Sequence, residues 1–142
     1  MSNTKIMLAT LAIGAAIGFA GPAFAEKMTI MLDGASEVPP NTSAGKGTAE
    51  IDYDAASKKL SWKVSYSGLT GPATAAHFHG PAEAGKNAGV AVPIPNIATS
   101  PAEGSATLTD AQAADFAAGK YYVNVHTAAN PGGELRGQVV KK

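Results

Sequence analysis

Three histidines are the candidate functional residues of this sequence. His77 and His79 flank Phe78 in the stretch AHFHG, and His126 lies far downstream in YYVNVHTAANPGG. Side chains two positions apart on a strand share one face and lie about 6–7 Å apart along the chain. Imidazoles at this spacing can lean toward one ion, with bonds of about 2.0–2.1 Å from each nitrogen. The spacing therefore indicates a metal site as one interpretation of His77 and His79.

His126 has the matching orientation if its segment is a strand. Residues 121, 123 and 125 are apolar, so the alternation places Tyr122, Asn124 and His126 on the face away from the core. All three histidines converge if this strand neighbours the strand of His77 and His79. The alternative is that they are ordinary polar residues on solvent-facing positions, which alternate with core positions in any half-buried sheet.

The donor set and its neighbours suggest which ion such a site would take. Three neutral imidazoles suit Cu(II), Zn(II) or Ni(II), and the divalent affinity order places copper highest, so copper is the expected cofactor and zinc the alternative. Glu134 is a candidate fourth ligand, or an acceptor for an imidazole N–H. Arg136 alternates with Glu134 and Gln138, which favours a solvated strand face. An ion pair with Glu134, or a role in guiding an anion to the metal, is the alternative for Arg136.

Other polar groups give weaker signals. Glu37 lies in the loop sequence SEVPP and is interpreted as a structural residue. No Ser/His/Asp or paired-carboxylate arrangement can be singled out, so no catalytic residue is assigned. Whether the protein is an enzyme is left open, with a non-enzymatic role favoured.

Apolar and polar residues alternate with period two through most of the chain, including the segments that carry the histidines. It is cleanest in KKLSWKVSYS, where Leu60, Trp62 and Val64 face one way. One short helix is expected after Thr109, with Gln112 completing a capping box and Gly119 ending it. The pattern predicts an all-β, antiparallel, Greek-key-like sandwich or barrel with about seven strands, at residues 27–32, 48–54, 58–67, 73–80, 104–109, 121–127 and 134–141. Prolines at positions 81, 93 and 95 keep the segment 80–96 off any central strand.

The first 25 residues have the features of a secretory signal peptide. Lys5 precedes an uncharged run from Ile6 to Ala20, and Ala23-Phe24-Ala25 supplies small residues where a signal peptidase reads. The run is shorter than the roughly 20 residues that span a bilayer. We therefore expect cleavage before Glu26 and one domain over residues 26–142, located in the periplasm or outside the cell and free of the membrane.

Charge and cysteine content exclude several kinds of partner. Residues 26–142 hold ten basic and eleven acidic side chains, a net charge of −1, so no basic surplus supports nucleic-acid binding. The chain has no cysteine, which excludes disulfides, thiol chemistry and thiolate metal sites.

Three separated segments resemble the CHRD domain, a module named from chordin and common in secreted bacterial proteins. They are LDGASEVPP, AHFHGPA and YYVNVHTAANPGGELRGQV, in the fitting order, and the resemblance covers roughly Met28 to Val140. It implies a β-sandwich or β-barrel module, and for most bacterial members of that family no activity is established.

A looser similarity connects the histidine pattern with copper–zinc superoxide dismutase. That Greek-key sandwich has a His-x-His pair on one strand, a copper-ligand histidine on a later strand, and an arginine after a Gly-rich turn. The matching positions are His77, His79, His126 and Arg136. The enzyme binds zinc with further histidines and an aspartate, whereas this chain has no other histidine, so the similarity implies at most a simpler one-metal site.

The leading hypothesis is a secreted CHRD domain that binds one transition metal ion through His77, His79 and His126. Two alternatives stay open. One is a metal-independent module that binds an extracellular protein through loops such as residues 80–96. The other is a reduced, copper-only enzyme similar to superoxide dismutase.

Overall fold

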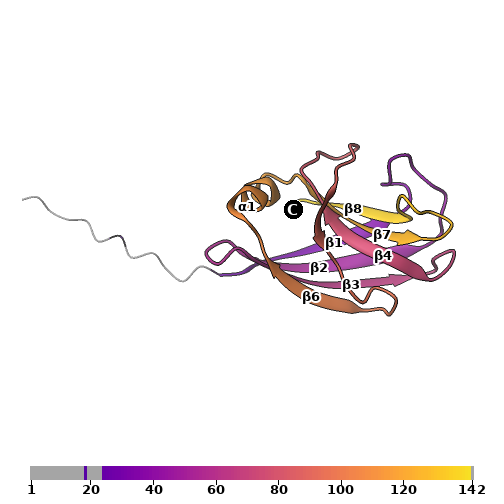
Figure 1. Cartoon of the computed structure of the whole chain (residues 1–142), viewed down its shortest axis with the longest axis horizontal. Coiled ribbons are helices and arrows are strands. Elements are labelled where there is room, and N and C mark those ends of the chain that lie inside the picture. Colours follow the sequence, from indigo (N-terminus) through magenta and orange to yellow (C-terminus); the bar gives the residue numbers. More distant parts are fainter. Residues whose placement is uncertain (1–17, 19–23, 142) are drawn as a thin grey trace, which may run out of the picture.

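The computed structural model describes Gly18 and residues 24–141 (Figure 1). This part of the chain forms eight strands and one short helix, which confirms the expected all-β fold class. The elements are β1 (Glu26–Asp33), β2 (Lys46–Asp54), β3 (Lys59–Ser67), β4 (Ala73–His79), β5 (Val90–Pro93), β6 (Ala102–Thr107), α1 (Asp110–Ala117), β7 (Tyr121–Thr127) and β8 (Leu135–Val139).

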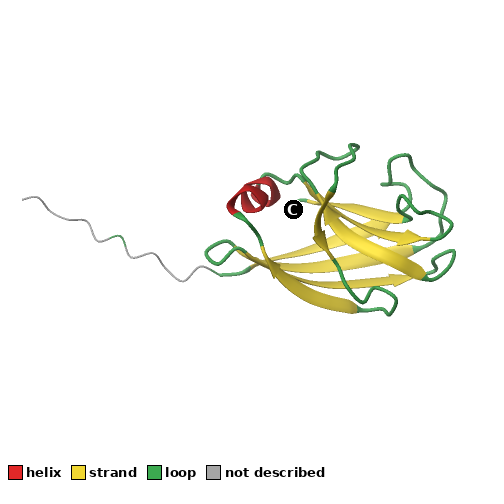
Figure 2. Cartoon of the chain, viewed as in Figure 1, coloured by secondary structure: helices red, strands yellow, loops and turns green. Residues whose placement is uncertain are grey.

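The strands form one antiparallel sheet in the order β5-β4-β7-β8-β1-β2-β3-β6. The sheet folds over on itself, so that the layer of β5, β4, β7 and β8 faces the layer of β1, β2, β3 and β6 in a nearly closed, barrel-like sandwich (Figure 2). The chain crosses between the two layers after β3, β5 and β6, which gives the Greek-key-like connections expected from the sequence. The pairing of β8 with β1 is limited to Asp33 and Arg136.

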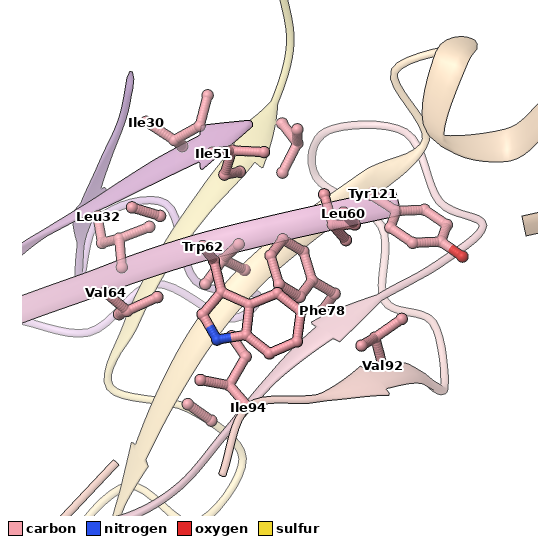
Figure 3. Packing of buried hydrophobic residues seen from close by; sticks show 14 of the residues in the cluster. Ile30, Leu32, Ile51, Leu60, Trp62, Val64, Phe78, Val92, Ile94 and Tyr121 are labelled. Carbon is pink, nitrogen blue, oxygen red and sulfur yellow. The ribbon is translucent and has the colours of Figure 1, made fainter. Parts of the chain in front are cut away.

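Apolar residues from both layers meet in one core (Figure 3). Leu60, Trp62 and Val64 of β3 are all buried, as their alternation predicts. Trp62 packs across the sandwich against Phe78 of β4, with ring centroids 5.4 Å apart. Burying a phenylalanine contributes roughly 1.5–3 kcal/mol, and the inward position of Phe78 turns the residues on either side of it to the opposite face of β4.

The helix α1 has the caps that the sequence predicts. The Thr109 hydroxyl accepts a hydrogen bond from Gln112 N at 3.2 Å, and Thr109 N donates to Gln112 Oε1 at 3.0 Å. Gly119 follows the helix with a φ of 73°. Phe116 packs against Tyr53 and Tyr121 at centroid distances of 4.6 and 5.6 Å, so the helix covers one end of the core.

Two details differ from the sequence prediction. The eighth strand, β5, lies in the Pro-rich segment 80–96, for which the sequence predicts no strand, but it occupies the edge of the sheet and ends at Pro93. This position agrees with the exclusion of proline from central strands. The strand expected at residues 104–109 is instead Ala102–Thr107, because Thr109 serves as the N-cap of α1.

The predicted signal peptide lies almost entirely outside the described residues, so cleavage before Glu26 stays a prediction. Within the part of the chain that the structure describes, no helix has both the length and the apolar character needed to cross a bilayer.

Candidate metal centre

The strands that carry the three histidines are neighbours. In the β4–β7 ladder, His77 pairs with Asn124, His79 pairs with Tyr122, and His126 pairs with Ala75. Because these positions have the same parity, the three imidazoles lie on one face of the sheet, opposite Phe78. The three histidines therefore converge, because their strands lie side by side.

The imidazole nitrogens are close enough to share one ion. Each histidine offers a ring nitrogen, and the three nitrogens lie within 4.8 Å of one another. His77 Nδ1 and His126 Nε2 are 3.1 Å apart, which fits two bonds of about 2.0–2.1 Å to a common ion. The ring of His79 lies 5.2 Å from that of His77 and 6.0 Å from that of His126, measured between centroids.

Backbone carbonyls orient two of the three rings. His79 Nδ1 lies 3.0 Å from Ala88 O, and His126 Nδ1 lies 2.8 Å from Pro131 O. A carbonyl oxygen can only accept, so Nδ1 carries the proton in both neutral rings and each Nε2 keeps its lone pair. His79 Nε2 is buried and has no hydrogen-bond partner. Such N–H to carbonyl bonds are the usual outer contacts of metal-bound histidine.

Burial and mutual proximity favour the neutral, metal-binding form of His77 and His79. Burial lowers the pKa of His77, and the neighbouring His126 and His79 lower it further. Burial also lowers the pKa of His79, although the hydrogen bond to Ala88 opposes this. Protons compete with metal ions for imidazole nitrogen, so a lowered pKa leaves the lone pairs free at neutral pH.

An aromatic and cationic stack supports His79. The Tyr122 ring lies parallel to the imidazole, with an interplanar angle of 4° and centroids 4.9 Å apart. The guanidinium carbon of Arg136 lies 3.5 Å from the centroid of the same tyrosine ring. Since β7 lies between β4 and β8, His79 and Arg136 approach Tyr122 from opposite sides. The stack restricts rotation of the His79 ring.

A scan against protein-family models matched the CHRD domain over residues 28–139. The chain belongs to the CHRD domain family. The match includes all three histidines, as well as Tyr122 and Arg136, so the cluster lies within the CHRD domain itself. Searches of curated proteins and of solved structures found no match. The similarity to copper–zinc superoxide dismutase therefore stays a prediction from the residue pattern.

Arg136 is not on the solvated face that its alternation suggested. It is 2% exposed, because the loop between β4 and β5 covers this part of the CHRD domain. Arg136 Nη1 donates to Asn87 Oδ1 at 2.9 Å, and its other terminal nitrogen donates to Lys86 O. The loop is held further by the Tyr122 hydroxyl, which donates to Ala88 O at 3.2 Å and accepts from Ala88 N at 3.1 Å.

Glu134 points its carboxylate into a cage of hydrogen-bond donors. Oε1 accepts from Ser43 Oγ at 2.6 Å and Thr70 N at 2.9 Å, and Oε2 accepts from Thr70 Oγ1 at 2.9 Å and Thr127 Oγ1 at 2.7 Å. Burial raises the pKa of Glu134, but hydrogen bonds from Ser43, Thr127 and Thr70 together lower it to about 2. Both oxygens are thus engaged with these donors, and the carbonyls of Ala88 and Pro131 accept from the imidazoles instead.

Two buried polar residues meet beside Gly133, and the sequence predicts neither of them as part of the metal site. Asn124 is 2% exposed, and Glu37, which was assigned a structural role in its loop, is 5% exposed. A Cβ added at Gly133 would overlap both Glu37 Oε1 and Asn124 Nδ2, so the two side chains meet over this glycine. Burial raises the pKa of Glu37 to about 7, although the charge of Arg136 opposes this. In the sequence, only the alternation that places Asn124 on the same face as His126 indicates that it lies near the site.

Proposed function

We propose that this chain is an exported CHRD domain that binds a single copper(II) ion through His77, His79 and His126. The observation that carries the proposal is the convergence of three imidazole nitrogens within 4.8 Å on one sheet face. The carbonyls of Ala88 and Pro131 support it, because they hold the Nδ1 protons of His79 and His126 and make Nε2 the ligand atom of each ring. The third ligand atom is His77 Nδ1, which already faces His126 Nε2.

The choice of copper follows from the donor set. Three neutral nitrogen donors bind divalent first-row metals in an order in which copper(II) exceeds nickel(II) and zinc(II). An exported protein also meets metal ions outside the metal-buffered cytosol. Zinc would use the same three nitrogens with water in a fourth position. A competition titration between copper(II) and zinc(II) distinguishes the two ions. With no assigned catalytic group, copper carriage or storage is the favoured role.

Titration calorimetry of the purified protein with copper(II) tests the proposal. We expect tight binding of one ion per chain, and loss of that binding in the double variant His77→Ala/His126→Ala. These two histidines are chosen because both are partly exposed, so their removal disturbs the fold less than removal of His79. Glu50→Gln/Glu103→Gln serves as the control, since it removes two exposed carboxylates of the opposite layer.

The outcomes separate the alternatives. Weak or multi-site copper binding that the double histidine variant retains would contradict the proposal. If zinc displaces copper in direct competition, the three-histidine site is retained and the bound ion is zinc. Export is tested independently by the mass of the protein recovered outside the cytoplasm, which should correspond to a chain beginning at Glu26.

A further inference from the structure

A positive charge is buried near the metal centre without an ion-pair partner. Arg136 is 2% exposed, and none of the ion pairs among residues 24–141 includes it. Its terminal nitrogens donate to Asn87 Oδ1 and Lys86 O, which are both neutral acceptors. Buried charges are usually paired, because taking a single charge out of water is costly. The fold therefore leaves a net positive charge at this position.

The acidic groups of the neighbouring segments do not cancel this charge through an ion pair. Burial raises the pKa of Glu37 to about 7, although the charge of Arg136 opposes this, so Glu37 is mainly protonated at about pH 6. Asp33 pairs with Arg136 in the β1–β8 ladder, but its carboxylate accepts from Ser36 N at 2.8 Å. The oxygens of Glu134 accept four hydrogen bonds from other residues. Each carboxyl group thus has a state or a partner of its own.

A stack of side chains connects Arg136 with the metal centre. The guanidinium carbon lies 3.5 Å from the centroid of the Tyr122 ring, whose centroid is 4.9 Å from that of His79. These two steps place the guanidinium on the order of 10 Å from an ion held by His79. Tyr122 is 3% exposed and His79 is 8% exposed, so little water screens the two charges from each other. The charge of Arg136 therefore acts on an ion at the three histidines.

The ligands themselves carry no negative charge that would offset this repulsion. The candidate cluster consists of His77, His79 and His126 and includes no carboxylate. A copper(II) ion would bring two positive charges into this neutral donor set, and a copper(I) ion would bring one. Because Coulomb energy is proportional to each charge, the guanidinium repels copper(II) twice as strongly as copper(I). The arrangement therefore favours the reduced ion.

We propose that Arg136 acts as a fixed positive charge that shifts copper held by the three histidines toward copper(I). The proposal rests on the proposed copper-binding function and specifies the oxidation state that the site prefers. One electron from an external small-molecule reductant converts copper(II) to copper(I), and no proton transfer accompanies it. Arg136 does not touch the ion and acts through its charge alone. The cargo of this protein is then copper in its reduced form.

The dissociation constant for copper(II) divided by that for copper(I) tests the proposal. Calorimetry measures the first constant, and competition with a copper(I)-specific chelator in anaerobic ascorbate measures the second. Arg136→Gln removes the charge and keeps an N–H donor for the loop. One unit charge at this separation changes the ratio about tenfold when the effective dielectric constant is about 20. We therefore expect the ratio to fall about tenfold in Arg136→Gln.

Controls separate the charge of Arg136 from its contacts. Arg136→Lys keeps the charge but loses the planar stack on Tyr122, so its ratio should stay within about threefold of the wild type. Lys63→Gln removes an exposed positive charge from β3 in the opposite layer and should leave the ratio unchanged. The measurements are made at about pH 6. Glu37 is then mainly protonated in the wild type, and it stays so in Arg136→Gln, because loss of the cation raises its pKa further.

A second variant keeps the test decisive if the first does not fold. Trp62 fluorescence establishes that each variant is folded, and calorimetry establishes that each binds one copper ion. Gln138 pairs with Tyr122 in the β7–β8 ladder and donates to Ala82 O and Gly119 O. Gln138→Lys keeps an N–H donor for these carbonyls and adds a positive charge, so it should raise the ratio. If Arg136→Gln does not fold, Gln138→Lys decides the question.

Two results would overturn the inference. One is a ratio that changes by less than about twofold in the deciding variant while copper still binds, which leaves the proposed function intact. The other is an equal change in Arg136→Lys or in Lys63→Gln, which would assign the effect to lost loop contacts or to net charge. Failure of the wild type to bind copper would remove both the proposed function and this inference.

Discussion

Replacing Glu134 with glutamine tests how much one buried carboxylate stabilises the fold. The side chain is completely buried and accepts four hydrogen bonds. The donors come from Ser43 in the β1–β2 connection, Thr70 in the β3–β4 connection, and Thr127 at the end of β7. The substitution keeps the size of Glu134 and its acceptor for Thr70 N, and the threonine hydroxyls can rotate to accept from the new amide. It therefore removes mainly the charge.

The magnitude follows from the pKa of Glu134. The folded protein lowers this pKa from 4.5 to about 2, a difference of about 2.5 units, and each unit corresponds to 1.36 kcal/mol. The ionised form thus stabilises the fold by about 3 kcal/mol at neutral pH. Because the folded pKa is lowered, this contribution is fully present above the unfolded pKa and is lost as the pH falls through the folded pKa. At about pH 3 it is about 1.4 kcal/mol.

Urea denaturation followed by the fluorescence of Trp62, the single tryptophan of the chain, measures this effect. Trp62 is 5% exposed and packs on Phe78, so unfolding changes its environment. We expect Glu134→Gln to unfold with a free energy about 3 kcal/mol lower than the wild type at about pH 7. The difference between the two proteins should shrink by more than half at about pH 3.

The same experiment can refute the reasoning. A loss below about 1 kcal/mol at neutral pH would mean that desolvation of the carboxylate cancels its hydrogen bonds. A loss of the expected size that does not decrease toward acid pH would assign the effect to packing instead of charge. Glu50→Gln, at an exposed position of β2, should leave the free energy of unfolding within about 0.5 kcal/mol of the wild type.

Two further predictions concern the core and the metal site. Gly104→Ala should lower the free energy of unfolding by about 1–3 kcal/mol, because its Cβ would lie 2.7 Å from Cζ2 of Trp62. Urea denaturation measures this loss, and an unchanged midpoint would show that Trp62 can shift without cost. Copper(II) affinity should persist below the ordinary histidine pKa of 6.5, because the pKa values of His77 and His79 are lowered. Competition titrations between about pH 8 and pH 5 measure this dependence, and a decline that begins above pH 6.5 would contradict it.

Local patterns predicted the parts of the fold that depend on neighbouring residues. Alternation placed Trp62 and Phe78 in the core, and the capping box fixed the start of α1 at Thr109. The outward parity of His77, His79 and His126 was also readable, since side chains alternate along every strand. Whether β4 and β7 are neighbours is a matter of topology, which the alternation pattern leaves open and the structure decides.

The loops over the outer sheet face could not be predicted from periodicity. Alternation marks Tyr122, Asn124 and Arg136 as polar-side positions, and such positions are usually solvated in antiparallel sheets. Here the β4–β5 loop lies over Tyr122 and Arg136. It is linked to the β1–β2 loop by Asn87 Nδ2, which donates to Val38 O at 3.0 Å. These contacts join residues far apart in the sequence, so the local pattern contains no record of them.

The two edge strands of the sheet, β5 and β6, affect how readily this protein aggregates at high concentration. An unpaired strand edge is a template onto which another chain can add, and short strands, prolines and charges reduce that tendency. The β5 edge has four residues and ends at Pro93, which has no N–H to donate. The β6 edge follows Pro101 and presents the exposed carboxylate of Glu103. Both edges therefore disfavour strand-to-strand aggregation, a useful property for a chain without disulfides to hold it closed.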